Sequence, residues 1–297
     1  MENNLSELCA LYSAVRLGIF PDQKRFTKHF RTPIEKNNDA ERRDILRARI
    51  APFTLRRTKA AVLADLPPKT ESVSMIDLSG RQVELYESVR ATMEKKVRDA
   101  MAERGLARSH IIVLEALLKL RQVCCDPRLL KTASGAKCAT QHSAKLEALV
   151  EQLLQLVSEG RRVLVFSQFV EMLELIKSEL REPNIKYLEL NGQTQKRAEV
   201  VREFQKGQSL VFLISLKAGG SGLNLTAADT VIHYDPWWNP AVESQATDRA
   251  HRIGQDKPVF VYKLITRGTV EEKILALQQR KTQLLKCILF ENPDQET

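Results

Sequence analysis

Two arginines stand close together near the end of the chain, within residues 245–255 (Gln-Ala-Thr-Asp-Arg-Ala-His-Arg-Ile-Gly-Gln). On a continuous helix, Gln245, Arg249 and Arg252 would fall on one polar stripe. Guanidinium groups are always charged, and their forked donors match phosphate oxygens. The stripe therefore predicts a site that grips a phosphate chain, and the alternative is an ordinary solvated basic face. The residues expected to seat this helix on a core are Val242, Ala246, Ala250 and Ile253.

A glycine-rich loop precedes the arginines. It covers residues 215–225 (Ser-Leu-Lys-Ala-Gly-Gly-Ser-Gly-Leu-Asn-Leu) and directly follows the apolar run 210–214. Glycines at positions 219, 220 and 222 let the backbone turn tightly or approach a phosphate closely, and the cluster alone does not choose between these roles. Lys217 and Asn224 beside the glycines favour contact with phosphates.

The elements that must position these residues follow from the alternation of apolar runs and amphipathic stretches after residue 143. We expect strands at 163–166, 185–190, 209–214, 229–234 and 259–265, and helices at 170–181, 195–206, 239–253 and 269–289. This order predicts a parallel α/β sheet with helices on both faces. Ligands of such a sheet collect at the carboxyl ends of the strands, where Ser167, Gly192, Ser215 and Asp235 are expected.

The first half of the chain is predicted to be mostly helical. Residues 1–65 read as helices that include a basic helix at 39–50, and two longer helices are expected at 81–103 and 111–123. Pro67 and Pro68 cannot continue a helix, so they mark the best boundary in the chain. A strand is possible just after them, at 72–77.

Composition narrows the class of protein. The 46 basic and 37 acidic residues give a net charge of +9, which favours polyanionic partners. The five cysteines are odd in number and form no Cys-x-x-Cys pair, so neither a disulfide scaffold nor a zinc ribbon is indicated. A four-ligand metal set of Cys124, Cys125, Cys138 and His142 is conceivable, but buried thiols are the favoured interpretation, and we expect no metal ligands. No signal peptide or bilayer-spanning apolar run is present, which favours a reducing intracellular setting without a membrane partner.

Several ordered segments resemble the helicase motifs of the Swi/Snf family of superfamily-two ATPases. Residues 163–169 are similar to motif four, 190–194 to the short motif that follows it, 215–225 to motif five and 245–255 to motif six. The segments 53–59 and 66–69 resemble the connection between the two lobes of that family, and 235–240 (Asp-Pro-Trp-Trp-Asn-Pro) resembles its coupling loop. The resemblance implies a RecA-like second lobe of the P-loop NTPase fold, with an inserted helical subdomain.

The resemblance also implies a domain organisation. Residues 1–66 would be the helical end of the first lobe, 67–75 the inter-lobe linker, 76–140 the inserted helical protrusion, 141–290 the RecA-like lobe and 291–297 a tail. The sequence holds neither a phosphate loop nor an Asp-Glu-x-His box. We therefore expect half of an ATPase, natural or cloned, in which a first lobe would bind most of the ATP and Mg²⁺.

The roles of single residues come from the same resemblance. The arginine fingers would be Arg249 and Arg252, and the other nucleotide contacts Gln245, Gly222 and Asn224. The contacts with DNA would be Ser167, Gln168, Gly192, Thr194, Ser215, Lys217, Gly219, Trp237 and Trp238. The tryptophans have core filling as their alternative. Glu243 would orient an arginine, while His233 and His251 are expected in core or surface roles.

The function implied is that of a motor that moves along double-stranded DNA. Its partners would be duplex DNA, the first lobe and a DNA-bound protein. It would be cytoplasmic and nucleoid-associated in a bacterium or archaeon, or nuclear in a eukaryote. The alternative is a non-catalytic basic α/β module that binds DNA or protein.

Overall fold

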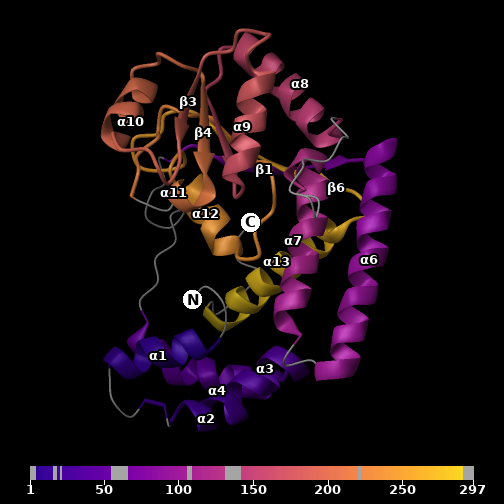
Figure 1. The fold of residues 1–297 in the computed structure, drawn as a ribbon. Coiled ribbons are helices and arrows are strands. Elements are labelled where there is room, and N and C mark those ends of the chain that lie inside the picture. The colour runs from indigo at the N-terminus through magenta and orange to yellow at the C-terminus, as the bar shows by residue number, and fades with distance from the viewer. Residues whose placement is uncertain are drawn as a thin grey trace. The chain divides into compact units, whose positions relative to one another are not determined.

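The computed structural model describes residues 5–15, 19–20, 22–54, 66–105, 109–130, 142–219 and 222–289. The chain forms two compact units (Figure 1). The first, called here the helical unit, consists of Met1–Ala64, Trp238–Ala241 and Ala276–Thr297. The second, called the sheet unit, consists of Asp65–Trp237 and Val242–Leu275.

A six-stranded sheet in which every pairing is parallel organises the sheet unit. Its strands are β1 (Lys69–Ile76), β2 (Val163–Ser167), β3 (Tyr187–Leu190), β4 (Val211–Ser215), β5 (Thr230–His233) and β6 (Val259–Thr266). They lie in the order β1-β6-β5-β2-β4-β3. The central strands β2, β4 and β5 are buried at every position, as expected where helices cover both faces. The predicted α/β class is confirmed.

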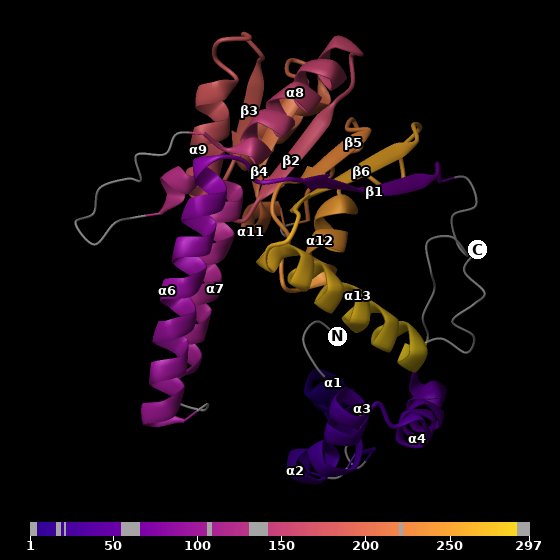
Figure 2. The ribbon, with the colours of Figure 1, turned by 90° about the vertical axis from the view of Figure 1, so that its right-hand side faces the viewer.

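Alternate residues of the central strands supply two separate cores. Val163 and Val165 of β2 pack on one face with α8 (Ala144–Ser158) and α9 (Val170–Glu179), which Figure 2 shows beside the sheet. Leu164 and Phe166 pack on the other face. The helices on that face are α10 (Arg197–Gln205), the short α11 (Leu216–Gly219) and α12 (Pro240–Thr247).

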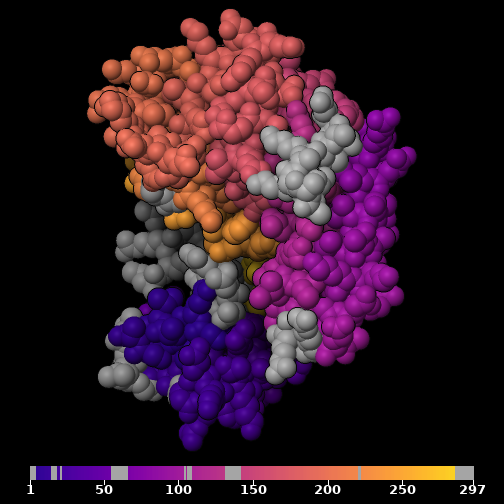
Figure 3. Space-filling model, in the orientation of Figure 1, coloured from indigo at the N-terminus to yellow at the C-terminus, as the bar shows by residue number. Residues whose placement is uncertain are grey.

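Two long antiparallel helices, α6 (Arg81–Arg104) and α7 (His110–Cys125), form a hairpin that lies between β1 and α8 in the chain. They lie side by side in both ribbon views, and their side chains close into one continuous surface (Figure 3). The hairpin is tied down at its base. The Val270 amide donates to the Tyr86 hydroxyl (2.9 Å), and the Gln82 amide group donates to the Val123 carbonyl (2.8 Å). Both helices were predicted, and both are confirmed.

The helical unit has a core of its own. Its elements are α1 (Leu5–Val15), α2 (Gln23–Phe26), a wide helical turn at Thr27–Arg31, α3 (Thr32–Asn37), α4 (Ala40–Ile50) and a short turn at Ala51–Phe53. Leu5, Phe26 and Leu46 are fully buried, and Leu284 of α13 (Val270–Leu289) packs against the same cluster. The predicted basic helix is confirmed as α4, with the Asp39 carboxylate capping it by accepting from the Arg42 amide (3.0 Å).

Two expectations need correction. The segment 67–75 was expected to be a linker, but its residues from Lys69 belong to β1, which pairs with β6 along its whole length. The predicted helix 239–253 ends at Thr247, and tight turns follow it. Most of the segment 53–59 lies outside the described residues. None of the described helices has the length and apolar character needed to cross a bilayer.

Candidate nucleic-acid interface

Four segments meet at the carboxyl edge of the sheet, as predicted. Ser167 and Ser215 end β2 and β4 and are register partners. Gly192 follows β3, which pairs with β4, and Asp235 follows β5, which pairs with β2. Because all of these pairings are parallel, the loops after the four strands leave the sheet on the same side. The sheet therefore assembles the expected site residues of these loops on one edge.

The two serines are not exposed there. Ser167 and Ser215 are only 1% and 3% exposed. The Ser167 hydroxyl accepts a hydrogen bond from the Phe169 amide (3.2 Å) and so shapes the start of the following loop. We conclude that Ser167 acts on the position of its loop.

Gln168 and Lys217 offer polar groups at the same edge. Gln168 is half-buried and Lys217 is exposed. Together with Phe169, Leu216, Trp237 and Val242, they line an open pocket of about 380 Å³. The exposed ammonium of Lys217 suits an anion such as a backbone phosphate, while the side-chain nitrogen of Gln168 is buried and its oxygen accepts from Arg121.

The turn after β3 presents backbone groups to solvent. Gly192 is exposed and Thr194 is half-buried. The Thr194 hydroxyl accepts from the Asn191 amide (3.0 Å), and the Asn191 side chain accepts from the Gln193 amide (2.8 Å). These bonds fix the turn and leave the face at Gly192 open, with no atom within 4 Å of the position that a Cβ would take.

Asp235 is a buried carboxylate that connects two loops. Its two oxygens accept from the backbone amide of Gln168, at 3.2 and 3.3 Å. Its Oδ2 lies 3.6 Å from Nη2 of the buried Arg121. Burial raises the pKa of Asp235 to about 6, although the charge of Arg121 and a hydrogen bond from Ser167 act in the opposite direction. Asp235 thus orients the loop after β2 and has no exposed surface of its own to offer a ligand.

The glycine loop is held by close contacts at its start. A Cβ on Gly219 would lie 2.8 Å from Cε1 of the buried Phe166 ring, so glycine is required there. The Gly219 carbonyl accepts from Arg249 Nε (3.1 Å). Gly220 and Ser221 lie outside the described residues, and Gly222 is exposed with a φ of +33°.

Replacing Gly219 by alanine is expected to lower the free energy of unfolding by about 1–3 kcal/mol, because the new methyl group overpacks against Phe166. Gly192→Ala is the matched control, since its methyl group meets nothing within 4 Å, and a change of no more than about 0.5 kcal/mol is expected. Urea unfolding measures both values. Equal losses for the two variants would contradict the contact.

The arginines are arranged differently from the predicted stripe. Arg249 lies beyond the end of α12 and is buried, whereas Gln245 and Arg252 are exposed. The chain turns after α12 ends at Thr247. In this turn the Arg252 amide donates to the Ala250 carbonyl (3.2 Å), and Gly254 has a φ of +94°. The expectation of one helical stripe is therefore wrong. Ala246 and Ala250 are in the core as predicted, but Ile253 is 69% exposed and is not.

Four of the expected nucleotide contacts are exposed, on the glycine loop, on α12 and on the turn after it: Gly222, Asn224, Gln245 and Arg252. They offer hydrogen-bond donors and one guanidinium group, which suit phosphate oxygens. Among the residues that the structure describes, no cluster of three or more His, Cys, Asp or Glu side chains could hold a metal ion.

The two tryptophans fall in different units. Trp237 is half-buried in the sheet unit, packs on the core and donates its backbone amide to Glu243 Oε1 (2.7 Å). Trp238 is half-buried in the helical unit, where its carbonyl accepts from Lys281 Nζ (3.5 Å). Glu243 is buried and also lies 3.2 Å from Lys263 Nζ, so it fixes the loop that carries Trp237. Its expected action on an arginine stays a prediction.

His233 and His251 each contact other parts of the protein. His233 stacks on Phe166 with ring centroids 5.6 Å apart, and its Nε2 lies 2.9 Å from the Thr247 hydroxyl. Burial lowers the pKa of His233 to about 4, so the ring is neutral at pH 7. His251 Nε2 donates to the Pro67 carbonyl (2.8 Å). The expected core role of His233 is confirmed.

Sequence analysis missed Arg121, which lies in α7 and reaches the loops after β2 and β5. One signal could have found it. Arg121 stands three and four positions before two buried cysteines and so shares their face of the helix, where a permanently charged group requires a partner inside the protein.

Comparison with known proteins identifies relatives over almost the whole chain. The model of the SNF2-related domain matches residues 1–129, and the model of the helicase conserved C-terminal domain matches residues 144–254. The chain is 39% identical over 299 residues to the Bacillus subtilis protein named "Putative ATP-dependent helicase/translocase YwqA", covering 98% of this chain and 32% of that protein. It spans 27% to 32% of the length of its curated relatives from Bacillus and Mycoplasma.

Solved structures give the same result. The SWI2/SNF2 ATPase core domain of Sulfolobus solfataricus is 33% identical with a TM-score of 0.62, over 97% of this chain and 59% of that one. The same core in complex with double-stranded DNA is also 33% identical, with a TM-score of 0.61, over 95% of this chain and 59% of that one.

Proposed function

Because this chain belongs to the Swi/Snf family of helicase-like ATPases, we propose that it supplies the DNA-backbone contacts and arginine fingers of a motor that moves along double-stranded DNA. The observation that carries this proposal is the edge of the sheet, where Gln168, Gly192 and Lys217 present polar groups on three neighbouring loops. A relative of similar fold has been solved on duplex DNA, which supports the choice of ligand.

The proposed DNA contacts suit the sugar–phosphate backbone. Lys217 supplies a positive charge, the Gln168 and Thr194 side chains supply short polar contacts, and the open turn at Gly192 supplies backbone amides. Ser167, Ser215 and Gly219 are buried and act by fixing these loops. Contacts of this kind position a duplex without reading its bases, so weak sequence preference is expected.

The proposed nucleotide contacts face the ATP that a phosphate-loop lobe would hold. ATP with Mg²⁺ supplies the phosphoryl group that is transferred to water. The exposed Arg252 guanidinium places positive charge where negative charge spreads during that transfer, and Gln245, Gly222 and Asn224 add donors beside it. The buried Arg249 is the second finger, and its bond to Gly219 links the arginine turn to the glycine loop.

The domain boundaries implied by the family stay part of this proposal. The helical unit would be the helical end of a first lobe, and the sheet unit the second lobe with its inserted hairpin. The partners would be duplex DNA, a phosphate-loop lobe and a DNA-bound protein, within a bacterial or archaeal nucleoid or a eukaryotic nucleus.

Duplex binding by this chain should weaken steeply and linearly when log affinity is plotted against log salt concentration, because binding releases counterions from the phosphates. Lys217→Ala is expected to reduce that slope by about 1, the effect of losing one phosphate contact. Lys206→Ala removes an equal charge from an exposed residue just before β4, at the opposite edge of the sheet, and should leave the slope unchanged. Fluorescence anisotropy across a salt series measures the slopes, and equal effects of the two variants would remove Lys217 from the interface.

A further inference from the structure

Arg121 is a buried arginine that reaches from the helical hairpin into the edge of the sheet. It lies in the last turns of α7 and is 2% exposed. The backbone of the same helix end is fixed, because the Tyr234 hydroxyl donates to the Cys125 carbonyl (2.8 Å). The guanidinium group therefore extends from an anchored base.

The guanidinium group contacts two loops at once. Its Nη1 donates to Oε1 of Gln168 (3.0 Å), in the loop after β2. Its Nη2 donates to the Pro236 carbonyl and lies 3.6 Å from the Asp235 carboxylate, in the loop after β5. A planar guanidinium group holds its donors in a fixed fork, which suits acceptors on two loops better than the compact, freely rotating ammonium of lysine.

Two aromatic rings complete this contact. The guanidinium carbon of Arg121 lies 5.5 Å from the centroid of the Trp237 ring and 5.8 Å from that of Phe169. Cation–π contacts of this kind orient the ring as well as the cation. Arg121 thereby touches the side chain or backbone of both loops that carry the proposed DNA contacts Gln168 and Trp237.

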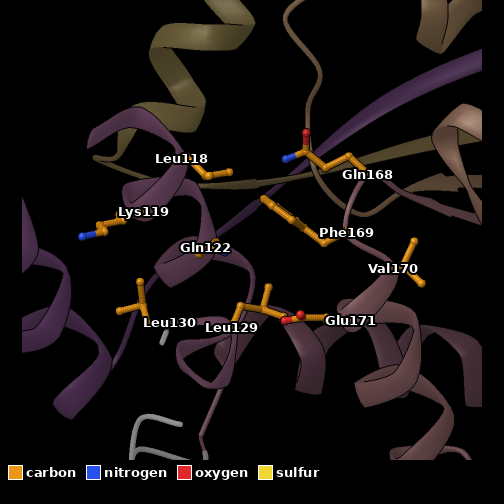
Figure 4. Close-up of a pocket in the computed structure, with 9 residues that line it drawn as sticks. All are labelled: Leu118, Lys119, Gln122, Leu129, Leu130, Gln168, Phe169, Val170 and Glu171. Carbon is orange, nitrogen blue, oxygen red and sulfur yellow. The ribbon is translucent and has the colours of Figure 1, made fainter. Parts of the chain in front are cut away.

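Nearby, the helix and the loop after β2 stand apart. Figure 4 shows an open groove between them, lined on the helix side by Leu118, Lys119 and Gln122 and on the loop side by Gln168, Phe169 and Val170. The groove measures about 520 Å³. Close packing is interrupted there, so the bonds of Arg121 join these two elements in addition to the core contacts of Cys125 and Phe169.

We infer that Arg121 is a positioning residue: it transmits the position of the α6–α7 hairpin to the loops after β2 and β5, and so sets where Gln168 and Trp237 meet a DNA backbone. The contacts of Arg121 with the two loops are seen in the structure, beside those of Asp235 and Glu243. Only the consequence for DNA binding rests on the proposed function.

The test must separate positioning from the plain need to neutralise Asp235. Arg121→Met combined with Asp235→Asn removes both charges of the buried pair. The asparagine keeps a side-chain oxygen that can accept from the backbone amide of Gln168. Arg121→Lys is the second variant, because it keeps the charge and loses the fork. Lys119→Met, on the same helix, removes one charge outside the contact and is the matched control.

The first measurement follows Trp237 without any DNA. The chain has two tryptophans, so a Trp238→Phe background leaves Trp237 as the only one. We expect its emission to shift to the red, and its quenching by acrylamide to rise, in the double variant and in Arg121→Lys, and not in Lys119→Met. Urea unfolding identifies the variants that are folded. Unchanged Trp237 emission and quenching in either folded Arg121 variant would overturn the inference.

The second measurement is duplex affinity by anisotropy, in the full chain at one salt concentration. Both Arg121 variants should bind about tenfold more weakly than Lys119→Met, a loss of the size expected when about two hydrogen-bonded contacts lose their geometry. Wild-type affinity in a folded variant whose Trp237 has moved would overturn the link to DNA. A wild-type chain that binds no duplex would instead refute the proposed function, and the Trp237 measurement would still decide the role of Arg121.

Discussion

Replacing Arg252 by alanine is expected to lower kcat for ATP hydrolysis by about a thousandfold in a protein that joins this chain to a phosphate-loop lobe. The guanidinium group of Arg252 is exposed on the turn after α12, so it is available to a phosphate held by another lobe. Its charge stabilises the transition state more than the bound ATP, and KM should therefore change much less than kcat. Steady-state hydrolysis at saturating duplex measures both constants.

The matched control is Arg181→Ala. Arg181 is also exposed, but it lies next to β3, which β5, β2 and β4 separate from β6, the strand that follows the Arg252 turn. Its replacement should leave kcat within about twofold of wild type, as expected for a surface change away from the site. If the two variants lose activity to the same extent, Arg252 has no specific part in phosphoryl transfer.

Replacing Lys145 by methionine is expected to lower the free energy of unfolding by about 3–5 kcal/mol. Lys145 of α8 is fully buried and forms an ion pair with the buried Glu271 of α13, and it also donates to the Leu264 carbonyl (3.3 Å). Burial acts to lower the pKa of Lys145, but the charge of Glu271 and the hydrogen bond to it are among the opposing contributions that together raise that pKa, so Lys145 is charged at pH 7. Methionine would leave a buried carboxylate without its cation.

Two further variants isolate the cause. Lys145→Met combined with Glu271→Leu removes both charges and should recover most of the loss, because no lone buried charge remains. Lys196→Met breaks the exposed pair with Glu199 and should change the free energy of unfolding by less than about 1 kcal/mol. Urea unfolding measures all of them. A double variant as unstable as Lys145→Met alone would show that the uncompensated charge is not the main cause of the loss.

The sheet could be predicted because its strands carry a strong local signal. Val163–Ser167 and Val211–Ser215 are short apolar runs between amphipathic helices, and a fully buried parallel strand requires such a run. The strand β1 was only partly recognised. It is an exposed edge strand that carries lysine, glutamate and serines, so neither burial nor alternation marks its first residues.

The site was harder to predict because it depends on contacts between distant residues. The hydrophobic periodicity predicted a helix that reaches residue 253, but α12 ends at Thr247. Beyond that end, Arg249 donates to the Gly219 carbonyl, 30 positions away in the sequence. The contacts of Arg121 span 47 and 115 positions, and a helical pattern reports only that this residue is polar. The ends of the strands could be placed from sequence, but the direction of each side chain could not.

The most direct test of the proposed motor is ATP hydrolysis by this chain joined to a phosphate-loop lobe, measured with and without duplex DNA at a salt concentration where anisotropy shows the duplex to be bound. The account predicts that duplex raises the rate of hydrolysis, because DNA held at the sheet edge favours the arrangement in which Arg252 reaches ATP. Duplex binding with the same rate of hydrolysis in both conditions would contradict it, and would instead support a non-catalytic DNA-binding module.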